Sequence, residues 1–283
     1  MIALLDTHQH LIYPDRARYS WTDDKPPLAH RAFTLGDYRA LTEHKGVAAT
    51  IFMEADAGDA DYRAEARFIA GLAAHPENRI IGMIASCRPE SADGFAAWID
   101  ECSALPVVGM RRILHEIDDE LSRGETFRAN IRHLGARGLT FDMCFRADQL
   151  GIAAELARAC PDTRLILDHC GIPDIAGGGL AGWKQGISAL ATLPNLACKV
   201  SGIMAYCAPG TASLETIRPY LDHCVDAFGP DRLLWGSDWP VVNLGGGIEA
   251  WIAVTRRYLD GWPDGEVEKL AYANAARIYN VIP

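Results

Sequence analysis

Short apolar segments recur along the chain, and each is followed by a longer segment whose apolar residues are spaced as on one face of a helix. The short segments are rich in β-branched residues and end at turn-forming residues, which is typical of buried parallel strands. Eight can be distinguished, at residues 3–5, 48–53, 80–85, 107–110, 139–144, 164–167, 196–200 and 232–235. Helical segments are predicted between them at 35–45, 61–74, 95–102, 149–160, 182–193, 214–228 and 247–259.

This alternation indicates eight strand-then-helix units in 283 residues. That number of units and that length match a (β/α)8 TIM barrel, an α/β fold whose strands are buried on both faces. A doubly wound open sheet is the alternative fold. Because no linker-like or low-complexity segment divides the chain, we expect a single domain over residues 1–283. We expect the stretch 12–33 to form a loop over the mouth of the barrel.

Charged and imidazole side chains gather where four of the apolar segments end. Barrel enzymes carry their catalytic groups at this end of the strands. Burying such groups costs free energy unless they are paired with a partner or serve in function. Any one of them alone would be explained as a hydrogen-bonded structural residue. His8 and His10 occupy alternate positions, so their rings should point to the same side of a strand. We interpret the four ends together as a candidate active site, with His8, His10, Arg111, His169 and Asp238.

Charge and composition narrow the possible partners. The net charge is −10, and no basic stripe suggests binding to nucleic acid or to an anionic membrane surface. No apolar run approaches the roughly 18–20 residues of a membrane span, and the start of the chain has no signal-peptide pattern, so we expect a cytoplasmic protein. The eight cysteines form no Cys-x-x-Cys pair and are interpreted as reduced, buried thiols.

Four motifs carry a resemblance over nearly the whole chain. They are His-x-His at 8–10, Asp-His-Cys-Gly-x-Pro at 168–173, Gly-Ser-Asp-Trp-Pro at 236–240 and Asn-Ala-Ala-Arg-Ile-Tyr at 274–279. In this order they resemble the amidohydrolase superfamily, and more narrowly its amidohydrolase-2 branch. That branch contains sugar lactonases of the L-fuconolactonase and L-rhamnonolactonase type and 2-pyrone-4,6-dicarboxylate lactonase. The resemblance implies a barrel hydrolase whose substrate is a small sugar-derived lactone.

The departures from the superfamily concern metal ions. Its metal-dependent members often carry a carboxylated Lys or a Glu at the end of strand four and a His at the end of strand five. This chain has Arg111 on the fourth segment and no His on the fifth. We therefore expect no binuclear centre and no required cofactor, since the branch also includes lactonases that work without a metal. The alternative is a single Zn²⁺ held by His8, His10 and Asp238, with His169 as a further ligand.

A mechanism follows from these residues as a hypothesis. Asp238 would act as the general base that takes a proton from water, and its alternative role is a helix N-cap. His8, His10, His169 and Arg111 would donate hydrogen bonds to the lactone carbonyl oxygen as charge develops. The expected substrate is an aldono-1,4- or 1,5-lactone, and the resemblance favours the L-fucono type. The acidic chain suits a neutral polyol better than a dicarboxylate.

Five further residues are candidates for substrate contacts: His115, Lys199, Trp21, Trp239 and Tyr206. His115 would bind substrate hydroxyls beside Arg111 or cap the following loop. Lys199 would reach the mouth or pair with a carboxylate. The three aromatic residues suit the apolar face of a sugar ring, although such residues also serve in packing.

Other functions remain as alternatives. Within the superfamily these are a zinc-dependent amidohydrolase and a non-oxidative decarboxylase, and outside enzymes an inactive barrel that acts as a binding protein. The glycine-rich stretch 177–182 matches Gly-x-Gly-x-x-Gly but lies beyond the sixth segment, so we interpret it as a flexible loop. The chain has no Gly-x-Ser-x-Gly motif for a serine hydrolase. Cys170, next to His169, should point to the opposite face and is not expected to be a nucleophile.

Overall fold

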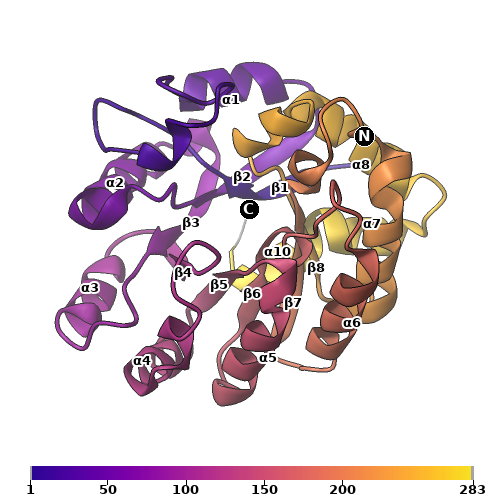
Figure 1. Ribbon diagram of the computed structural model, residues 1–283. Helices are drawn as coiled ribbons and strands as arrows, with labels where there is room; N and C mark the ends of the chain where they lie inside the picture. The colour runs from indigo at the N-terminus through magenta and orange to yellow at the C-terminus, as the bar shows by residue number, and fades with distance from the viewer. Residues whose placement is uncertain (1, 282–283) are drawn as a thin grey trace.

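Eight parallel strands form one sheet in chain order in the computed structural model, which describes residues 2–281 (Figure 1). The barrel is nearly closed: among the described residues, one parallel bridge between Gln9 and Trp239 joins the first strand to the segment after the last. This closure confirms the barrel and excludes the open sheet. The strands are β1 (Leu4–Gln9), β2 (Val47–Met53), β3 (Ile80–Ser86), β4 (Val107–Ile113), β5 (Thr140–Cys144), β6 (Leu165–Leu167), β7 (Leu196–Ser201) and β8 (Leu233–Gly236).

Helices surround the barrel, one after each strand. They are α1 (Leu35–Thr42), α2 (Gly58–Ala73), α3 (Phe95–Cys102), α4 (Glu125–Ala136), α5 (Leu150–Ala159), α6 (Leu180–Ala191), α7 (Leu214–Phe228) and α8 (Ile248–Leu259). The sequence pattern did not predict α4, because only Phe127, Ile131 and Leu134 form its buried stripe among mostly polar residues. Since α6 begins at Leu180, only the first half of the glycine-rich stretch 177–182 is a loop.

Local sequence explains where two of these helices begin. Thr34 accepts a hydrogen bond from the backbone N–H of Asp37, whose carboxylate accepts one from the backbone N–H of Thr34, a capping box at the start of α1. Ser213 is the N-cap of α7, and its side chain accepts a hydrogen bond from the backbone N–H of Thr216. The buried face of α7 then repeats every three or four residues, at Leu214, Ile217, Leu221, Cys224 and Phe228.

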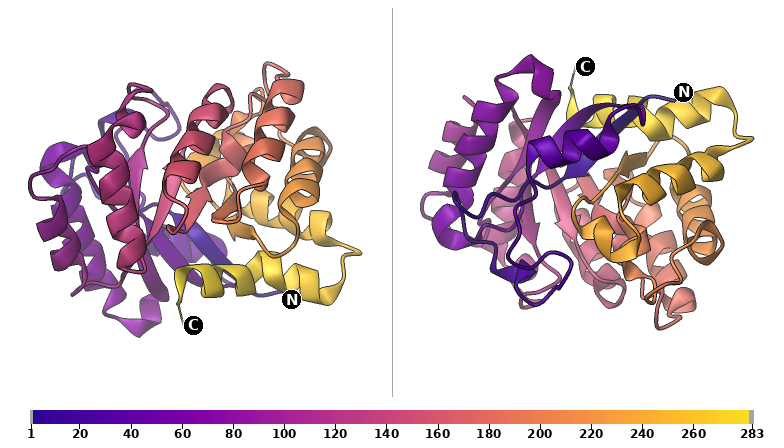
Figure 2. Two further views of the ribbon diagram at one scale, coloured as in Figure 1. Left: turned by 90° about the horizontal axis from the view of Figure 1, so that it is seen from below. Right: turned by 90° about the horizontal axis from the view of Figure 1, so that it is seen from above.

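The last helix closes the end of the barrel where the strands begin (Figure 2). After α9 (Asp264–Glu268) and a π-helical turn (Lys269–Ala273), α10 (Asn274–Tyr279) packs on the inner barrel residues Leu5, Ile166 and Leu234. Asn274 donates to the carbonyl oxygen of Leu233 at 2.9 Å and so ties α10 to β8. With this end closed, access to the barrel interior is left to the opposite end, where the strands finish.

The long stretch 12–33 lies on the side where the strands finish. An antiparallel bridge between Ile12 and Phe33 joins its two ends. The indole of Trp21 donates to the carbonyl oxygen of Ala55, just after β2, at 2.7 Å. The stretch is therefore fixed against one side of the mouth.

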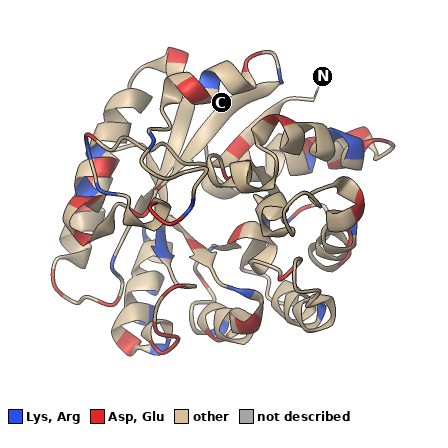
Figure 3. Ribbon diagram, turned by 45° about the horizontal axis from the view of Figure 1, so that its top comes forward, with Lys and Arg blue, Asp and Glu red and all other residues tan. Residues whose placement is uncertain are grey.

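The outer surface is mixed in charge, and Figure 3 shows acidic and basic residues interspersed over the surrounding helices. No helix within residues 2–281 combines the length and the apolar character needed to cross a membrane. All eight cysteines are free thiols, and each is buried except Cys207, which is partly exposed.

Candidate active site

The carboxylate of Asp238 lies among three imidazole rings at the end of the barrel where the strands finish. Its Oδ1 is 3.3 Å from Nε2 of His10 and 3.7 Å from Nε2 of His8, and its Oδ2 is 3.7 Å from Nδ1 of His169. The exposed fractions are 2 % for Asp238, 4 % for His10 and 4 % for His169. The structure thus brings four of the predicted residues together in an almost fully buried cluster.

The backbone around Asp238 is arranged to aim its side chain at the rings. Asp238 has a φ of 58° and His169 a φ of 53°, in the left-handed region that non-glycine residues rarely adopt. Such strain persists where surrounding structure imposes it, often at functional sites. Gly202, with a φ of 59°, makes room for the carboxylate, because a Cβ there would lie 2.2 Å from Oδ2 of Asp238.

The alternative of a helix cap for Asp238 does not match this geometry. Its backbone N–H donates to the carbonyl oxygen of His8 at 2.8 Å, which joins β8 to β1. Its carboxylate accepts no hydrogen bond from a backbone N–H in the part of the chain that the structure describes, and it faces the imidazoles instead. The carboxylate therefore faces the imidazoles with its acceptor oxygens, a position from which it could take up a proton or hold a cation.

His10 is oriented by the backbone. Its Nδ1 lies 3.0 Å from the carbonyl oxygen of Met53, and since a carbonyl only accepts, the hydrogen belongs to Nδ1. In the neutral ring Nε2 then carries a lone pair that faces Oδ1 of Asp238, so two acceptors face each other. A proton or a cation between them removes this repulsion, and a histidine held in this way is also the usual arrangement for a metal ligand.

Arg111 is fixed by Glu54. Its Nε lies 2.5 Å from Oε1 of Glu54, and its Nη2 donates to the Glu54 carbonyl oxygen at 2.7 Å. Both side chains are almost fully buried. Burial favours the neutral forms, but their mutual attraction outweighs it, so the pKa of Arg111 is raised and that of Glu54 lowered. The site therefore keeps a permanent cation inside the barrel.

Arg111 and Lys199 both reach the ring of His8. Nη1 of Arg111 lies 3.3 Å from Nε2 of His8, and Nζ of Lys199 lies 3.4 Å from Nδ1. Nδ1 is also 3.4 Å from Oδ1 of Asp168. Burial lowers the pKa of His8 well below its usual range, so the ring is neutral and carries one N–H. Because each ring nitrogen faces a cationic donor, the expected donation from His8 to a substrate carbonyl requires a change at one of these contacts.

Lys199 lies beneath the cluster and is 0 % exposed. Its Nζ is 2.5 Å from Oδ1 of Asp142 and 3.1 Å from Oδ1 of Asp168. Tyr279 of α10 donates to Asp142 at 2.8 Å, so the network continues to the closed end of the barrel. The structure therefore places Lys199 in a pair with carboxylates, the second of its two possible roles, and not at the mouth.

The two aspartates of this network differ in proton affinity. Burial raises the pKa of Asp142 to about 6 although Lys199 opposes the shift. Burial acts on Asp168 as well, but there the attraction of Lys199 prevails and its pKa lies well below the usual range. One lysine thus faces a carboxylate that stays ionised and a second that takes up a proton in mildly acidic solution.

Two of the other predicted residues face the cluster. The ring of Tyr206 is 6.3 Å from that of His169, and its side chain is half-buried. The side chain of His115 is 24 % exposed, and burial together with the nearby His169 lowers its pKa to about 4. Both residues are thus neighbours of His169.

The two tryptophans are placed differently. Trp239 is 1 % exposed and packs edge-on against Phe33 and Tyr38, with ring centroids 5.6 and 5.5 Å away. Its ring therefore lies in the core and does not offer a face to a sugar. Trp21 is bound to Ala55 on the rim and is partly exposed.

Comparisons with known proteins place this site in a family. Residues 5–281 match the sequence profile described as amidohydrolase. The chain belongs to the amidohydrolase family. An L-fucono-1,5-lactonase from Burkholderia ambifaria is 27 % identical, over 98 % of this chain and 95 % of that protein. A 4-sulfomuconolactone hydrolase from Rhizobium radiobacter is 27 % identical, over 83 % of this chain and 75 % of that protein.

A solved structure resembles this amidohydrolase along its whole length. It is an amidohydrolase from Burkholderia multivorans with bound zinc, with a TM-score of 0.90 and 27 % identity, covering 99 % of this chain and 100 % of that one. In the present amidohydrolase His8, His10 and Asp238 offer donor atoms within 4.8 Å of one another. Nε2 of His10 and Oδ1 of Asp238 face each other as acceptors, which fits a single divalent ion. Nη1 of Arg111 lies against Nε2 of His8 and competes with such an ion for that nitrogen.

A first prediction concerns the ion pair that holds Arg111. We expect Glu54→Gln to lower the free energy of unfolding by about 1.5–3 kcal/mol, because the buried guanidinium loses a charged acceptor but keeps its carbonyl partner. Denaturant unfolding measures this loss. Glu101→Gln is the matched control, since Glu101 pairs with Arg67 on the surface and should leave stability close to wild type. Equal effects of the two substitutions would contradict the structural importance of the buried pair.

Proposed function

We propose that this amidohydrolase hydrolyses the lactone of a sugar acid, an aldonolactone of the L-fucono type. The observation that carries the proposal is the carboxylate of Asp238, held among His8, His10 and His169 at the end of the barrel opposite the C-terminal helix. The lactone-hydrolysing names of the relatives in Burkholderia and Rhizobium support it.

Asp238 acts as the general base. A water molecule beside its carboxylate loses a proton to Asp238 as its oxygen attacks the lactone carbonyl carbon. When the ring C–O bond breaks, the proton passes to the departing ring oxygen, and the products are a carboxylic acid and a hydroxyl group on one open chain. General-base catalysis of this kind contributes roughly 100- to 10,000-fold to the rate.

The neighbouring groups stabilise the charge that develops on the carbonyl oxygen. Arg111 supplies a fixed positive charge inside the barrel and His169 lies 3.7 Å from Asp238, whereas Nε2 of the neutral His10 ring is an acceptor. Loss of one such donor in other enzymes costs on the order of 3 kcal/mol of transition-state stabilisation. Lys199 acts indirectly, by holding Asp168 ionised against Nδ1 of His8.

A lactone is an activated ester, so we expect turnover without a required metal. A zinc ion held by His8, His10 and Asp238 would supply Lewis-acid polarisation of the carbonyl or of water. The facing acceptors of His10 and Asp238, and the zinc in the Burkholderia multivorans structure, favour this zinc-dependent reaction as the second candidate.

The side chains near the opening suit a neutral polyol. Tyr206 offers an aromatic ring, and His115 is held neutral at physiological pH by its lowered pKa of about 4. The fixed cation Arg111 is already balanced by Glu54, which leaves little positive charge for a dicarboxylate. We therefore expect hydroxyl-rich lactones to be preferred over dicarboxylate lactones.

The test is a pH-indicator assay of the purified protein, its metal content measured, on L-fucono-, L-rhamnono-, L-galactono- and D-arabinono-lactones with and without a chelator. Acid release that survives complete metal removal supports the proposal and ranks the sugars. Activity that disappears with the metal and returns with zinc supports the zinc-dependent reaction. Absence of acid release from every lactone contradicts both and favours a decarboxylase or a binding protein.

A further inference from the structure

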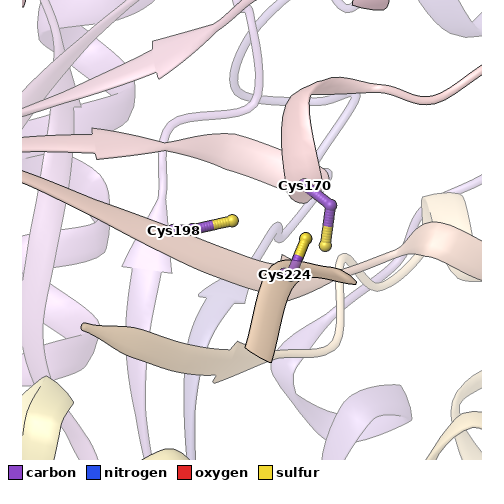
Figure 4. A group of neighbouring side chains, drawn as sticks. All are labelled: Cys170, Cys198 and Cys224. Carbon is purple, nitrogen blue, oxygen red and sulfur yellow. The ribbon is translucent and has the colours of Figure 1, made fainter. Parts of the chain in front are cut away.

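Three cysteines meet outside the barrel wall, apart from the cluster around Asp238. Cys170 follows β6, Cys198 lies on β7, and Cys224 lies on α7 (Figure 4). Their Sγ atoms all lie within 4.8 Å of one another, and each residue is 0 % exposed. Three separate segments of the chain therefore bring their thiols to one buried point that the proposed hydrolysis does not use.

The strand and helix positions explain why these thiols meet. Lys199 points into the barrel toward Asp142, so the preceding residue, Cys198, points out toward the helices. Cys224 is on the buried face of α7, which packs on β7. Cys170 lies over the same strand, with its Sγ 3.7 Å from the carbonyl oxygen of Lys199. The thiols thus occupy the layer between the barrel wall and α7.

We propose that Cys170, Cys198 and Cys224 form a binding site for a soft metal ion of low coordination number, Cu(I). Sulfur ligands select soft ions of this kind. Three metal–sulfur bonds of about 2.3 Å in one plane place the sulfur atoms about 4 Å apart, and the observed separations lie within 4.8 Å. A structural zinc site takes four protein ligands, whereas the group among the described residues has three.

The surroundings favour a ligand that brings positive charge. In this buried layer a thiolate without a partner is costly. Sγ of Cys170 lies 3.7 Å from the carbonyl oxygen of Lys199 and within 4.8 Å of the other two sulfur atoms. The segment that carries Cys170 is held in place by the indole of Trp183, which donates to the Cys170 carbonyl oxygen at 2.8 Å. The fold therefore holds the three sulfur atoms together, and a positively charged ion would stabilise their thiolate forms.

Binding requires no electron transfer. Each thiol that becomes a thiolate ligand forms one Cu–S bond and releases one proton to solvent, and copper stays in the Cu(I) state. The affinity should therefore fall as the pH falls, as for other thiolate sites.

The test is an anaerobic titration of the reduced, metal-free protein with Cu(I) in competition with a Cu(I)-specific chromophoric chelator. We expect the wild-type chain to retain a single Cu(I), with an X-ray absorption spectrum that shows a shell of sulfur atoms only. Cys224→Ala and Cys198→Ala should each lose the retained ion while circular dichroism shows them folded. The matched control is Cys102→Ala, since Cys102 is a buried cysteine of α3 outside the group, and this variant should retain the ion.

Several outcomes overturn the proposal. Wild-type protein that yields all Cu(I) to the chelator has no such site. Equal retention by wild type and folded Cys224→Ala, or a spectrum with nitrogen ligands, places the ion elsewhere. Loss of the ion in His10→Ala but not in the cysteine variants assigns it to the cluster around Asp238.

Discussion

Asp238→Asn is expected to lower kcat/KM for lactone hydrolysis by about 100- to 10,000-fold, because an amide cannot take the proton from water. The substitution keeps the size of the side chain, and the backbone contact of residue 238 with His8 does not depend on the carboxylate. The decrease should lie in kcat, since the base acts in the transition state. Steady-state kinetics on the best lactone of the panel measures it.

The control for this prediction is Asp226→Asn. Asp226 lies exposed on α7, away from the cluster, and its substitution should leave turnover unchanged. Far-ultraviolet circular dichroism of both variants shows whether each is folded. Retention of most of the turnover by folded Asp238→Asn would contradict the assignment of Asp238 as the base.

Lys199→Met is expected to have the largest effect on stability. It leaves Asp142 and Asp168 without their shared cation in the barrel interior, and removing one partner of a buried ion pair costs about 3–5 kcal/mol. The loss should be accompanied by reduced turnover, because Asp168 no longer stays ionised against His8. Denaturant unfolding at several pH values measures the free energy.

The pH dependence of this loss has a defined sign. The pKa of Asp142 is about 6 even beside Lys199, and without the lysine it rises further. The folded variant then binds more protons than the unfolded chain, so its unfolding free energy falls as the pH rises. The deficit relative to wild type should be smaller near pH 5 than near pH 8. The control, Lys269→Met, removes a surface ion pair with Asp231, and its unfolding free energy should stay close to that of wild type at pH 5 and at pH 8. A deficit of Lys199→Met that grows toward low pH would contradict the role given to Lys199, Asp142 and Asp168.

The barrel could be predicted because its strands are buried on both faces and therefore appear as apolar segments. The helix α4 could not, because a stripe of three apolar residues among polar ones gives a weak periodic signal. The predicted first and fourth strands were too short, because β1 and β4 continue through polar residues such as His8 and Arg111. Polar residues inside a strand interrupt the pattern that identifies it.

The site was predicted only in part. Glu54 was missed although it follows the second apolar segment directly, the same signal that identified His169 and Asp238. Asp142 was missed because the fifth apolar segment was searched only for a histidine, and its single acidic residue was not considered as a site residue. The orientation of Lys199 could not be predicted, because sequence alone does not tell which strand residues face the barrel interior.

The most direct test of the central claim is a time course of L-fucono-1,5-lactone ring opening, followed by proton NMR in buffered water with wild-type protein, with Asp238→Asn and without protein. The account predicts fast conversion to the open-chain acid by wild type, and a rate for Asp238→Asn that is lower by about 100- to 10,000-fold. Ring opening by wild type at the rate of buffer, or at the rate of a fully folded Asp238→Asn variant, would contradict it.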